Sequence, residues 1–333
     1  MKETPLETGK LPPQLLRELL DGAPTLDEAV RIGPSVGEDA CAIRVEAGEI
    51  VVATDPITLT GRGVGAHAVQ INANDVAVMG VRPRYFLCAL LLPVGTTPSE
   101  LRALFADMSR ALVDLGAALV GGHSEVTDAV SRPVVVGQMI GVAAAGEALS
   151  SGAMRPGDSV LQVGAAPVEG AAVLAAEAAP ERATVSPALL ERARVALDDP
   201  GISIVEPALL LAAEGARALH DPTEGGLSAG LHEIAEASGL RIALQESAVL
   251  WFEPGTALCE AVGADPWGTL ASGTLLAAVP PNRVDRALSA LDARDLPAAV
   301  IGEAIEGSGV TLASGLPLPR FDRDELYRVL GSP

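Results

Sequence analysis

The sequence predicts a two-domain protein of mixed α+β (α/β) structure, and three observations support this prediction. The chain has 333 residues, and domains commonly hold about 100–200 residues, so the length fits two domains. In both halves, continuous apolar runs alternate with segments whose apolar residues have helical spacing. A polar stretch rich in Gly, Ser and Pro separates the halves at 147–158. We therefore expect an N-terminal domain over residues 1–150 and a C-terminal domain over residues 151–333.

The elements of the first half follow from apolar spacing and from turn residues. Continuous apolar runs are typical of parallel or otherwise buried strands, and one such run ends on Asp55. Thr97 and Glu100 match a capping box, and Gly116 ends the helix that follows. In order, we expect a helix at 13–20, a glycine-rich turn and strand at 33–45, a strand at 49–55, helices at 67–80 and 98–116 on either side of a strand at 85–93, a strand and loop at 118–127, and a strand at 133–143.

The second half continues the alternation. Leu227, Leu231 and Ile234 form one apolar stripe of a helix that Gly239 closes. We expect His220 to be a loop residue before this helix, and His232 to be solvent-exposed on it. The remaining elements are strands at 159–165, 273–280 and 300–307 and a helix at 282–293.

Composition and charge exclude several classes of partner. The chain has 43 acidic and 23 basic residues, a net charge of −20, which repels phosphate backbones and anionic lipid. We therefore expect neither nucleic acid nor a membrane as partner. No run reaches the roughly 18 apolar residues of a membrane span, and the first residues do not resemble a signal peptide, so we expect a cytoplasmic protein. Cys41, Cys88 and Cys259 lack metal-ligand spacing, and we expect buried thiols.

Four aspartates share a setting that suits metal and phosphate chemistry. Each stands at the end of an apolar run or in a loop that carries glycine; they are Asp39, Asp55, Asp75 and Asp221. Such carboxylates can converge on one cleft, where oxygen ligands suit a Mg²⁺ ion that carries nucleotide phosphates. A helix that begins just after Gly226 would offer N–H groups to an anion. The alternative is that each aspartate only forms a turn or caps a helix.

Five motifs in order carry a family resemblance: GEDACAIR, TDPIT, NANDVAVMG, GGHSEVT and HDPTEGGL. The series resembles the AIR synthase (PurM-like) superfamily, and within it the HypE-like hydrogenase maturation proteins. The resemblance implies a homodimer whose N-terminal sheet-and-helix domains form the interface, and an α+β C-terminal domain. It also implies ATP and Mg²⁺ as cofactors, a small-molecule substrate and a maturation protein as a further partner. The implied chemistry activates a carbonyl, amide or carboxylate oxygen with phosphate from ATP.

The resemblance also assigns roles to individual residues. Its cofactor-binding positions are Lys10, Gly37, Asp39, Asn74, Asp75, Gly121 and Gly122. Its metal ligands are Asp39, Asp55 and Asp75, and Asp221 lies in its second-domain motif as the catalytic residue. We add Glu125 as a candidate metal ligand and His123 as a candidate catalytic residue, for the reasons that follow.

His123 departs from the family pattern, because many members have an acidic residue after the paired glycines. Imidazole is a poor ligand for Mg²⁺, which prefers oxygen. Glu125, two residues on, could supply the carboxylate from the same side of an extended segment. Alternatively, His123 is a general acid or base, since its ordinary pKa lies near 6.5. Both alternatives remain open at this stage.

The C-terminal residues are a second departure. HypE-like proteins end in a tail whose cysteine receives a carbamoyl group, whereas no cysteine follows Cys259 here. Residues 322–330 instead have a short amphipathic pattern. Such a pattern favours a C-terminal segment that packs against the protein over a mobile tail that carries a substrate. We therefore expect no substrate bound to cysteine. Two other functions remain open: a nucleotide-binding scaffold or regulator without turnover, and a small-molecule kinase similar to thiamine-monophosphate kinase.

Overall fold

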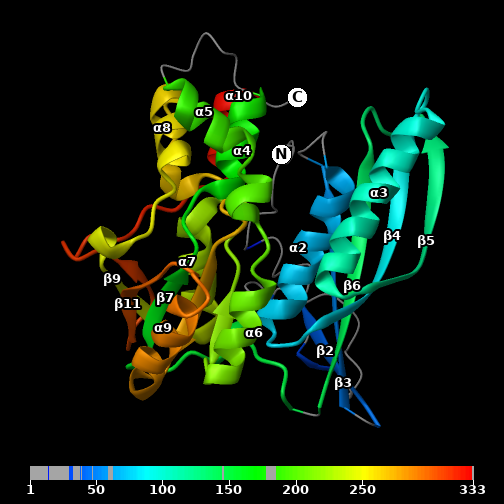
Figure 1. The fold of residues 1–333 in the computed structure, drawn as a ribbon. Helices are drawn as coiled ribbons and strands as arrows, with labels where there is room; N and C mark the ends of the chain where they lie inside the picture. The colour runs from blue at the N-terminus through cyan, green and yellow to red at the C-terminus, as the bar shows by residue number, and fades with distance from the viewer. Residues whose placement is uncertain are drawn as a thin grey trace, which may run out of the picture. The chain divides into compact units, whose positions relative to one another are not determined.

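The computed structural model describes Gln14 and residues 30–32, 38, 40–46, 48–58, 63–144, 146–177 and 185–331. The chain forms two compact units, and Asp39–Leu149 make up most of one and Ser150–Pro333 most of the other. Each unit combines a six-stranded sheet with helices, so the predicted α+β class is confirmed (Figure 1). The helix expected at 13–20 lies, apart from Gln14, outside the described residues.

The N-terminal unit is a sheet with helices packed on one face (Figure 1). The strand order is β1-β2-β3-β6-β4-β5, and every pair is antiparallel except β4 with β5. The elements are β1 (Val30–Ile32), β2 (Cys41–Val45), β3 (Gly48–Ile57), α2 (Val64–Val78), β4 (Pro83–Pro93), α3 (Pro98–Leu115), β5 (Ala118–Thr127) and β6 (Val134–Ala143).

Alternating burial along β4 shows which face of this sheet the helices cover. Phe86, Cys88, Leu90 and Leu92 are buried, whereas the residues between them are half-buried. Because side chains alternate across a strand, one face packs against α2 and α3 and the other is open. α3 begins as predicted, because the Thr97 side chain accepts the Glu100 N–H while the Glu100 carboxylate accepts the Thr97 N–H at 2.7 Å.

Two predictions need correction, one in each unit. Residues 118–127 form one continuous strand, not a strand followed by a loop, because parallel pairing with β4 continues as far as Thr127. Strand direction also differs from the parallel option that the apolar runs allowed. In the C-terminal unit, strand β10 (Leu275–Val279) is buried at every residue although both of its pairings are antiparallel. Its apolar run therefore reflects its central position in a covered sheet.

The C-terminal unit has the strand order β12-β9-β11-β7-β10-β8, with only β12 and β9 parallel. Its strands are β7 (Ser159–Val163), β8 (Ala218–His220), β9 (Arg241–Leu244), β10 (Leu275–Val279), β11 (Ala298–Ile305) and β12 (Gly309–Thr311). Its helices are α4 (Val168–Glu177), α5 (Pro187–Arg194), α6 (Val205–Glu214), α7 (Gly226–Ser238), α8 (Glu253–Val262), α9 (Val284–Asp292) and α10 (Glu325–Leu330). Short helical turns lie at Ser151–Ala153, Leu197–Gly201, Glu246–Ala248, Pro266–Gly268 and Pro281–Arg283.

The core of the C-terminal unit lies between α7 and the sheet. Leu227, Leu231 and Ile234, the predicted stripe of α7, are fully buried in one cluster with residues of β9, β10 and β11. Helices α4, α5 and α8 pack as a separate group, while α6 and α9 pack together and against β10 and β11. Among the described residues, no helix is long and apolar enough to cross a membrane.

Candidate active site

Asp55 lies near the end of β3 and is held against α2 by Asn72. The Asp55 N–H donates to Asn72 Oδ1 at 2.8 Å, and Asn72 Nδ2 donates to the Asp55 carbonyl at 3.3 Å and to the Ala68 carbonyl at 2.9 Å. Gly137 of β6 makes room for this contact, because a Cβ there would lie 2.4 Å from Asn72 Nδ2. Asn72 thus fixes the strand that carries Asp55. Asn72 is not among the predicted site residues, although it lies two residues before the Asn-Asp pair.

The third and fourth turns of α2 carry the predicted residues Asn74 and Asp75. Both are buried, with Asp75 6% exposed. Asn72 and Asp75 are three residues apart and therefore neighbours on the helix surface. Because Asn72 contacts Asp55, we infer that Asp75 faces the same junction of β3 and α2. Asn74 is two residues from Asn72 and projects from another side of the helix.

The paired glycines lie on β5, the edge strand of this sheet, and they differ in their steric situation. Gly122 has φ of 146°, and a Cβ there would lie 2.2 Å from the Cys88 carbonyl oxygen. A Cβ on Gly121 would meet only Leu87, at an ordinary contact of 3.5 Å. Close strand packing therefore requires glycine at 122, and no such requirement holds at 121.

His123 and Glu125 extend from the same side of β5, as expected for an extended segment. His123 Nε2 lies 3.3 Å from Glu125 Oε2, and the two side chains are 69% and 49% exposed. The parallel register pairs them with Ala89 and Leu91, which alternate with the buried residues of β4. The register therefore places them on the open face of the sheet.

Asp55 belongs to the other face of the same sheet. Asp55 pairs with Gly137 of β6, which in turn pairs with Cys88 of β4, so the three residues share one face of the sheet. Cys88 marks this face as the covered one, because it contacts Met108 of α3, with 3.8 Å between the sulfur atoms. Within one chain, Asn72 links Asp55 to the helix that carries Asp75, whereas Glu125 and His123 lie on the other face of the sheet.

Asp221 belongs to the C-terminal unit, in the loop between β8 and α7. It is 3% exposed. Gly225 and Gly226 both adopt left-handed backbone conformations, with φ of 83° and 69°, and a Cβ on Gly226 would lie 2.5 Å from the Trp267 carbonyl oxygen. The loop is also tied by the Ala271 N–H, which donates to the Thr223 carbonyl at 3.2 Å. The glycine pair is thus needed to fold this loop tightly against residues 267–271.

The anion expected at the start of α7 is a side chain of the protein itself. The Gly225 N–H donates to Asp324 Oδ2 at 2.8 Å. Asp324 is 2% exposed, and burial raises the pKa of its carboxyl to about 7.

His220 and His232 are buried, which corrects both predictions. His220 is the last residue of β8 and is 1% exposed, with Nε2 3.0 Å from Glu233 Oε2. His232 is 6% exposed, and its Nε2 lies 3.1 Å from the Leu318 carbonyl oxygen. Burial, followed by the nearby Arg320, lowers the pKa of His232. The sequence contained no signal for the second contact, because Leu318 is far along the chain.

The thiols that the structure describes have the expected environment. Cys88 and Cys259 are both buried. Burial raises the pKa of Cys88, and it raises that of Cys259 to about 11. A thiol with a raised pKa is a weak nucleophile near neutral pH, so neither is suited to carry a substrate. The side chain of Cys41 lies outside the described residues.

Three predicted site residues, Lys10, Gly37 and Asp39, also lie outside the described residues. Within the part of the chain that the structure describes, no three His, Cys, Asp or Glu side chains are grouped to hold a metal ion. Asp55 and Asp75 nevertheless offer the oxygen donors that Mg²⁺ prefers.

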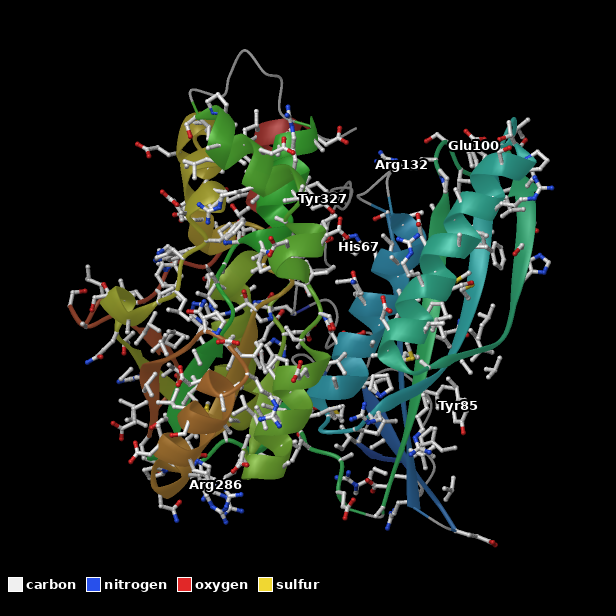
Figure 2. All side chains as sticks on the ribbon, in the orientation of Figure 1. His67, Tyr85, Glu100, Arg132, Arg286 and Tyr327 are labelled. Atoms are coloured by element: carbon white, nitrogen blue, oxygen red, sulfur yellow. The ribbon has the colours of Figure 1, made fainter. Side chains whose placement is uncertain are left out.

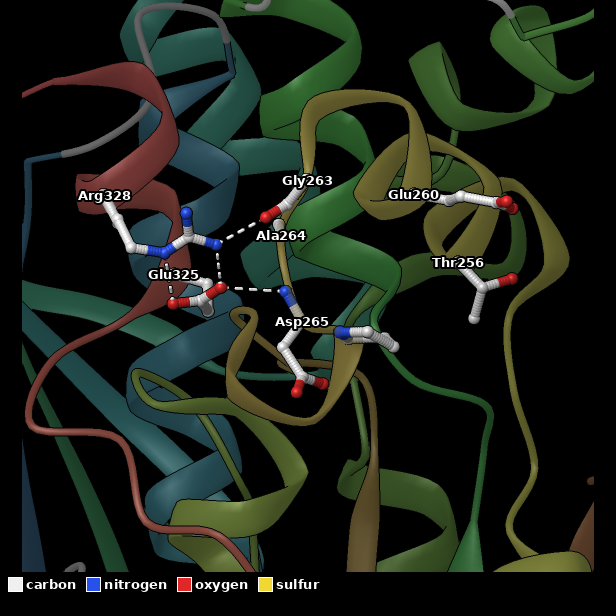
Figure 3. Close-up of a pocket in the computed structure, with 8 residues that line it drawn as sticks. Thr256, Glu260, Gly263, Ala264, Asp265, Glu325 and Arg328 are labelled. Carbon is white, nitrogen blue, oxygen red and sulfur yellow. Dashed lines mark hydrogen bonds and ion pairs between the residues drawn. The ribbon is translucent and has the colours of Figure 1, made fainter.

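An open pocket of about 460 Å³ lies elsewhere, in the C-terminal unit (Figure 3). Its lining residues are Thr256, Glu260, Gly263, Ala264, Asp265, Pro266, Glu325 and Arg328. None of them is a predicted site residue. Arg328 is bound to Glu325 and to the Gly263 carbonyl, so its charge is already satisfied by the protein (Figure 3). The carboxylates of the lining do not favour a nucleotide's phosphates.

Comparison with known families covers both units. Residues 37–143 match "AIR synthase related protein, N-terminal domain", and residues 155–314 match "AIR synthase related protein, C-terminal domain". Carbamoyl dehydratase HypE of Azotobacter vinelandii is 30% identical over 276 residues, which cover 80% of this chain and 78% of the relative. Carbamoyl dehydratase HypE of Escherichia coli K12 is 31% identical over 268 residues, covering 78% and 75%.

Solved structures agree with these matches. A HypE–HypF complex aligns with a TM-score of 0.74 at 25% identity and covers 92% of this chain and 99% of the solved one. HypE in complex with ATP gives a TM-score of 0.70 at 27% identity, with 87% and 90% covered. Thiamine monophosphate kinase from Aquifex aeolicus, at 18% identity and a TM-score of 0.69, covers 92% and 96% and shares the fold.

Proposed function

Because this chain belongs to the AIR synthase-related protein family, with a counterpart for each of its two units, we propose that it is an ATP- and Mg²⁺-dependent enzyme. In this proposal it activates a carbonyl, amide or carboxylate oxygen of a small substrate by phosphoryl transfer. The single observation that carries the proposal is the junction of β3 and α2, where Asn72 holds Asp55 on the same side of α2 as Asp75. Two carboxylates held there suit a metal ion that carries phosphates.

The relatives support the nucleotide and the reaction class. The HypE relatives are named carbamoyl dehydratases, and one HypE structure contains ATP. In the proposed reaction the substrate oxygen attacks the γ-phosphorus of ATP. The bond to the bridging oxygen breaks, and ADP leaves. The phosphorylated substrate then carries a better leaving group on the carbon that is to react.

Individual residues have distinct tasks in this reaction. Asp39, Asp55 and Asp75 would hold Mg²⁺, which when bound neutralises charge on the phosphate oxygens. Asn72 orients Asp55 through its two hydrogen bonds to the Asp55 backbone. Asp221 would act as the acid–base group on the substrate, from its loop before α7. Asn74, Gly121, Gly122, Lys10 and Gly37 would contact the nucleotide.

The proposed assembly is a homodimer formed through the N-terminal unit. β5 is an edge strand whose residues from Ala118 to Val126 are all exposed. Leu119, Val120 and Val126 are 44%, 53% and 59% exposed, and Tyr85 on the open face is 41% exposed (Figure 2). An uncovered apolar edge is prone to pair with another chain. A second copy of this unit would cover it.

The metal assignment is tested with Asp55→Asn combined with Asp75→Asn. Mg²⁺ and ATP together should raise the unfolding temperature of the wild type, because a ligand that binds only the native state stabilises it by mass action. The double variant should lose most of this rise and of any ATP turnover. Asp114→Asn on α3, an exposed aspartate of the same unit, is the control. A double variant that responds to Mg²⁺-ATP like the wild type would contradict the assignment.

Product analysis separates the enzyme from its two alternatives. ADP with free phosphate supports activation of a substrate oxygen that later loses phosphate. A stable phosphorylated metabolite would identify a small-molecule kinase, which the shared fold of thiamine monophosphate kinase makes the second candidate. Nucleotide binding without turnover would identify a scaffold, and the HypE–HypF complex makes a maturation protein the partner to test.

A further inference from the structure

The C-terminal residues 318–330, here called the C-terminal strap, are fastened along α7. The Leu318 N–H donates to the Val310 carbonyl at 3.0 Å, and the Leu318 carbonyl oxygen lies 3.1 Å from His232 Nε2. The Ser228 hydroxyl donates to the Pro319 carbonyl at 2.5 Å. Ser228 and His232 are one turn apart on α7 and both are buried. The strap therefore begins by following α7 back toward its first turn.

Further along the strap, Asp324 contacts the loop that carries Asp221. Its Oδ2 accepts the Gly225 N–H at 2.8 Å, and its Oδ1 accepts the Leu326 N–H at 2.9 Å, so it caps both the start of α7 and the start of α10. A second contact joins the strap to the same loop: the Tyr327 hydroxyl donates to Glu224 Oε1 at 3.1 Å. Two adjacent loop residues, Glu224 and Gly225, are thus each bound to the strap.

Other strap residues fasten it to the segment that packs under the loop. The Asp265 N–H donates to Glu325 Oε2 at 2.8 Å, and Arg328 donates to the Gly263 carbonyl at 2.6 Å (Figure 3). Phe321 lies against Gly268, where a Cβ would come within 2.5 Å of its ring. Since residues 267–271 in turn contact the loop, the strap holds the loop both directly and through its support.

We propose that the C-terminal strap positions the Asp-Pro-Thr-Glu-Gly-Gly loop and that Asp324 is its positioning residue. The inference deepens the proposed function and rests on it, since the loop matters for turnover through Asp221. Asp324 acts through the backbone of Gly225 and does not itself contact the substrate.

If the strap is held in this way, its docking should also depend on pH, because Asp324 is buried among acidic groups. Electrostatic interactions link Asp324 to Glu224 of the loop, Glu169 of α4, Cys259 of α8 and Tyr327 of its own helix, all of them acidic groups. Its chain neighbours are Arg323 and Glu325, and Glu325 is paired with Arg328. Burial first, and then Glu224 and Glu169, raise the pKa of Asp324 from 3.8 to about 7. The carboxyl of Asp324 therefore holds its proton more tightly when the strap is docked than when it is released. Docking is most stable below pH 3.8 and loses stability as the pH rises through about 7.

Hydrogen–deuterium exchange on the full chain tests the contact without reference to activity. We expect Asp324→Ala to increase exchange at residues 222–228 and 324–330 by about tenfold or more, because opening becomes easier. The control is Asp322→Asn, which makes a similar charge change at an exposed position of the same strap and should leave exchange unchanged. Unchanged exchange in Asp324→Ala would overturn the proposal.

The pH arm uses exchange corrected for its intrinsic rate. In the wild type, the opening constant of residues 324–330 should rise by about tenfold or more between pH 5 and pH 7. Asp324→Asn cannot ionise and should show a flat profile, whereas Asp322→Asn should follow the wild type. A wild-type profile that is flat, or one that Asp324→Asn reproduces, would overturn this pH dependence.

Turnover connects the strap to the proposed function. Asp324→Ala should lower kcat for ATP turnover by about tenfold while KM for ATP changes less than about twofold, because Asp324 acts on the loop that carries Asp221 and not on the residues proposed to contact ATP. Wild-type kcat should fall as the pH rises through neutrality, and Asp324→Asn should remove this fall. An unchanged kcat in Asp324→Ala together with increased exchange would overturn the positioning role. If the wild type has no turnover, the proposed function fails, while the exchange result still decides whether the strap holds the loop.

Discussion

Gly122 requires glycine because of its neighbour in the sheet, since a Cβ there would lie 2.2 Å from the Cys88 carbonyl oxygen. The family resemblance had assigned both paired glycines to the cofactor site, but at residue 122 close packing of the strands is enough to require glycine. His220 and His232 show the same limit of local reading. Both are buried: His220 contacts Glu233 of α7, and His232 contacts the carbonyl of Leu318, which is 86 residues away in sequence. Burial lowers the pKa of His232.

The exposed pair His123 and Glu125 gives a prediction at this scale. If Glu125 is a metal ligand, Glu125→Gln should weaken the apparent Mg²⁺ affinity by about tenfold while His123→Ala largely spares it. If His123 is an acid or base, His123→Ala should lower kcat by about a hundredfold or more with little change in nucleotide affinity. Magnesium titration of ATP turnover distinguishes the two.

Stability measurements provide the control for this pair. Both side chains are about half exposed or more, so neither substitution should change the free energy of unfolding by more than about 0.5 kcal/mol. Negligible effects of both substitutions on metal affinity and on kcat would remove the pair from the site.

At the scale of elements, the junction of β3 and α2 joins a strand end to a helix face. The Asn72 amide accepts one backbone hydrogen bond through Oδ1 and donates two through Nδ2. An ionised carboxylate could accept the first bond but could not donate the other two. The glycine at 137 on the neighbouring strand leaves the necessary space. Three elements thus cooperate to orient Asp55.

Asn72→Asp is the corresponding prediction. The carboxylate cannot donate to the Asp55 and Ala68 carbonyls, which leaves buried acceptors without their donor and should cost about 1–3 kcal/mol of unfolding free energy. Stabilisation by Mg²⁺-ATP should also decrease, because Asp55 is no longer held. Urea unfolding and thermal shift measure the two effects.

Asn282→Asp makes the same chemical change at an exposed position of the C-terminal unit and should change neither quantity. An Asn72→Asp protein as stable as the wild type would show that the junction does not depend on this amide.

At the scale of the whole molecule, assembly depends on β5 and on the open face of its sheet. Val120→Lys combined with Val126→Lys places two charges on the apolar edge, and we expect it to convert a wild-type dimer into a monomer. Sedimentation or light scattering at micromolar concentration measures this change. Leu316→Lys, at a residue of the C-terminal unit that is 64% exposed, should leave the dimer intact. A monomeric wild type would remove the support for the proposed interface.

Much of the fold could be predicted from the sequence because its signals are local. The capping box at Thr97, the glycine at 116 that ends α3 and the stripe of Leu227, Leu231 and Ile234 depend on spacings of three to seven residues. The short amphipathic pattern near the C-terminus likewise predicted docking, and Leu326 and Tyr327 of α10 are buried. The family resemblance depended on motifs of the same local kind, and the matches to both family domains confirm it.

The sequence by itself determined the elements with clear local signals, such as α3 and α7, the two-unit α+β architecture and the family. Only the tertiary structure decided which sheet face each site residue takes, that Asn72 holds Asp55, and that Asp324 occupies the N–H of Gly225. These contacts join residues that are 17 and 99 positions apart. No spacing rule reaches such separations, because strand register and chain reversal are set by packing of the whole unit and not by local conformational preference.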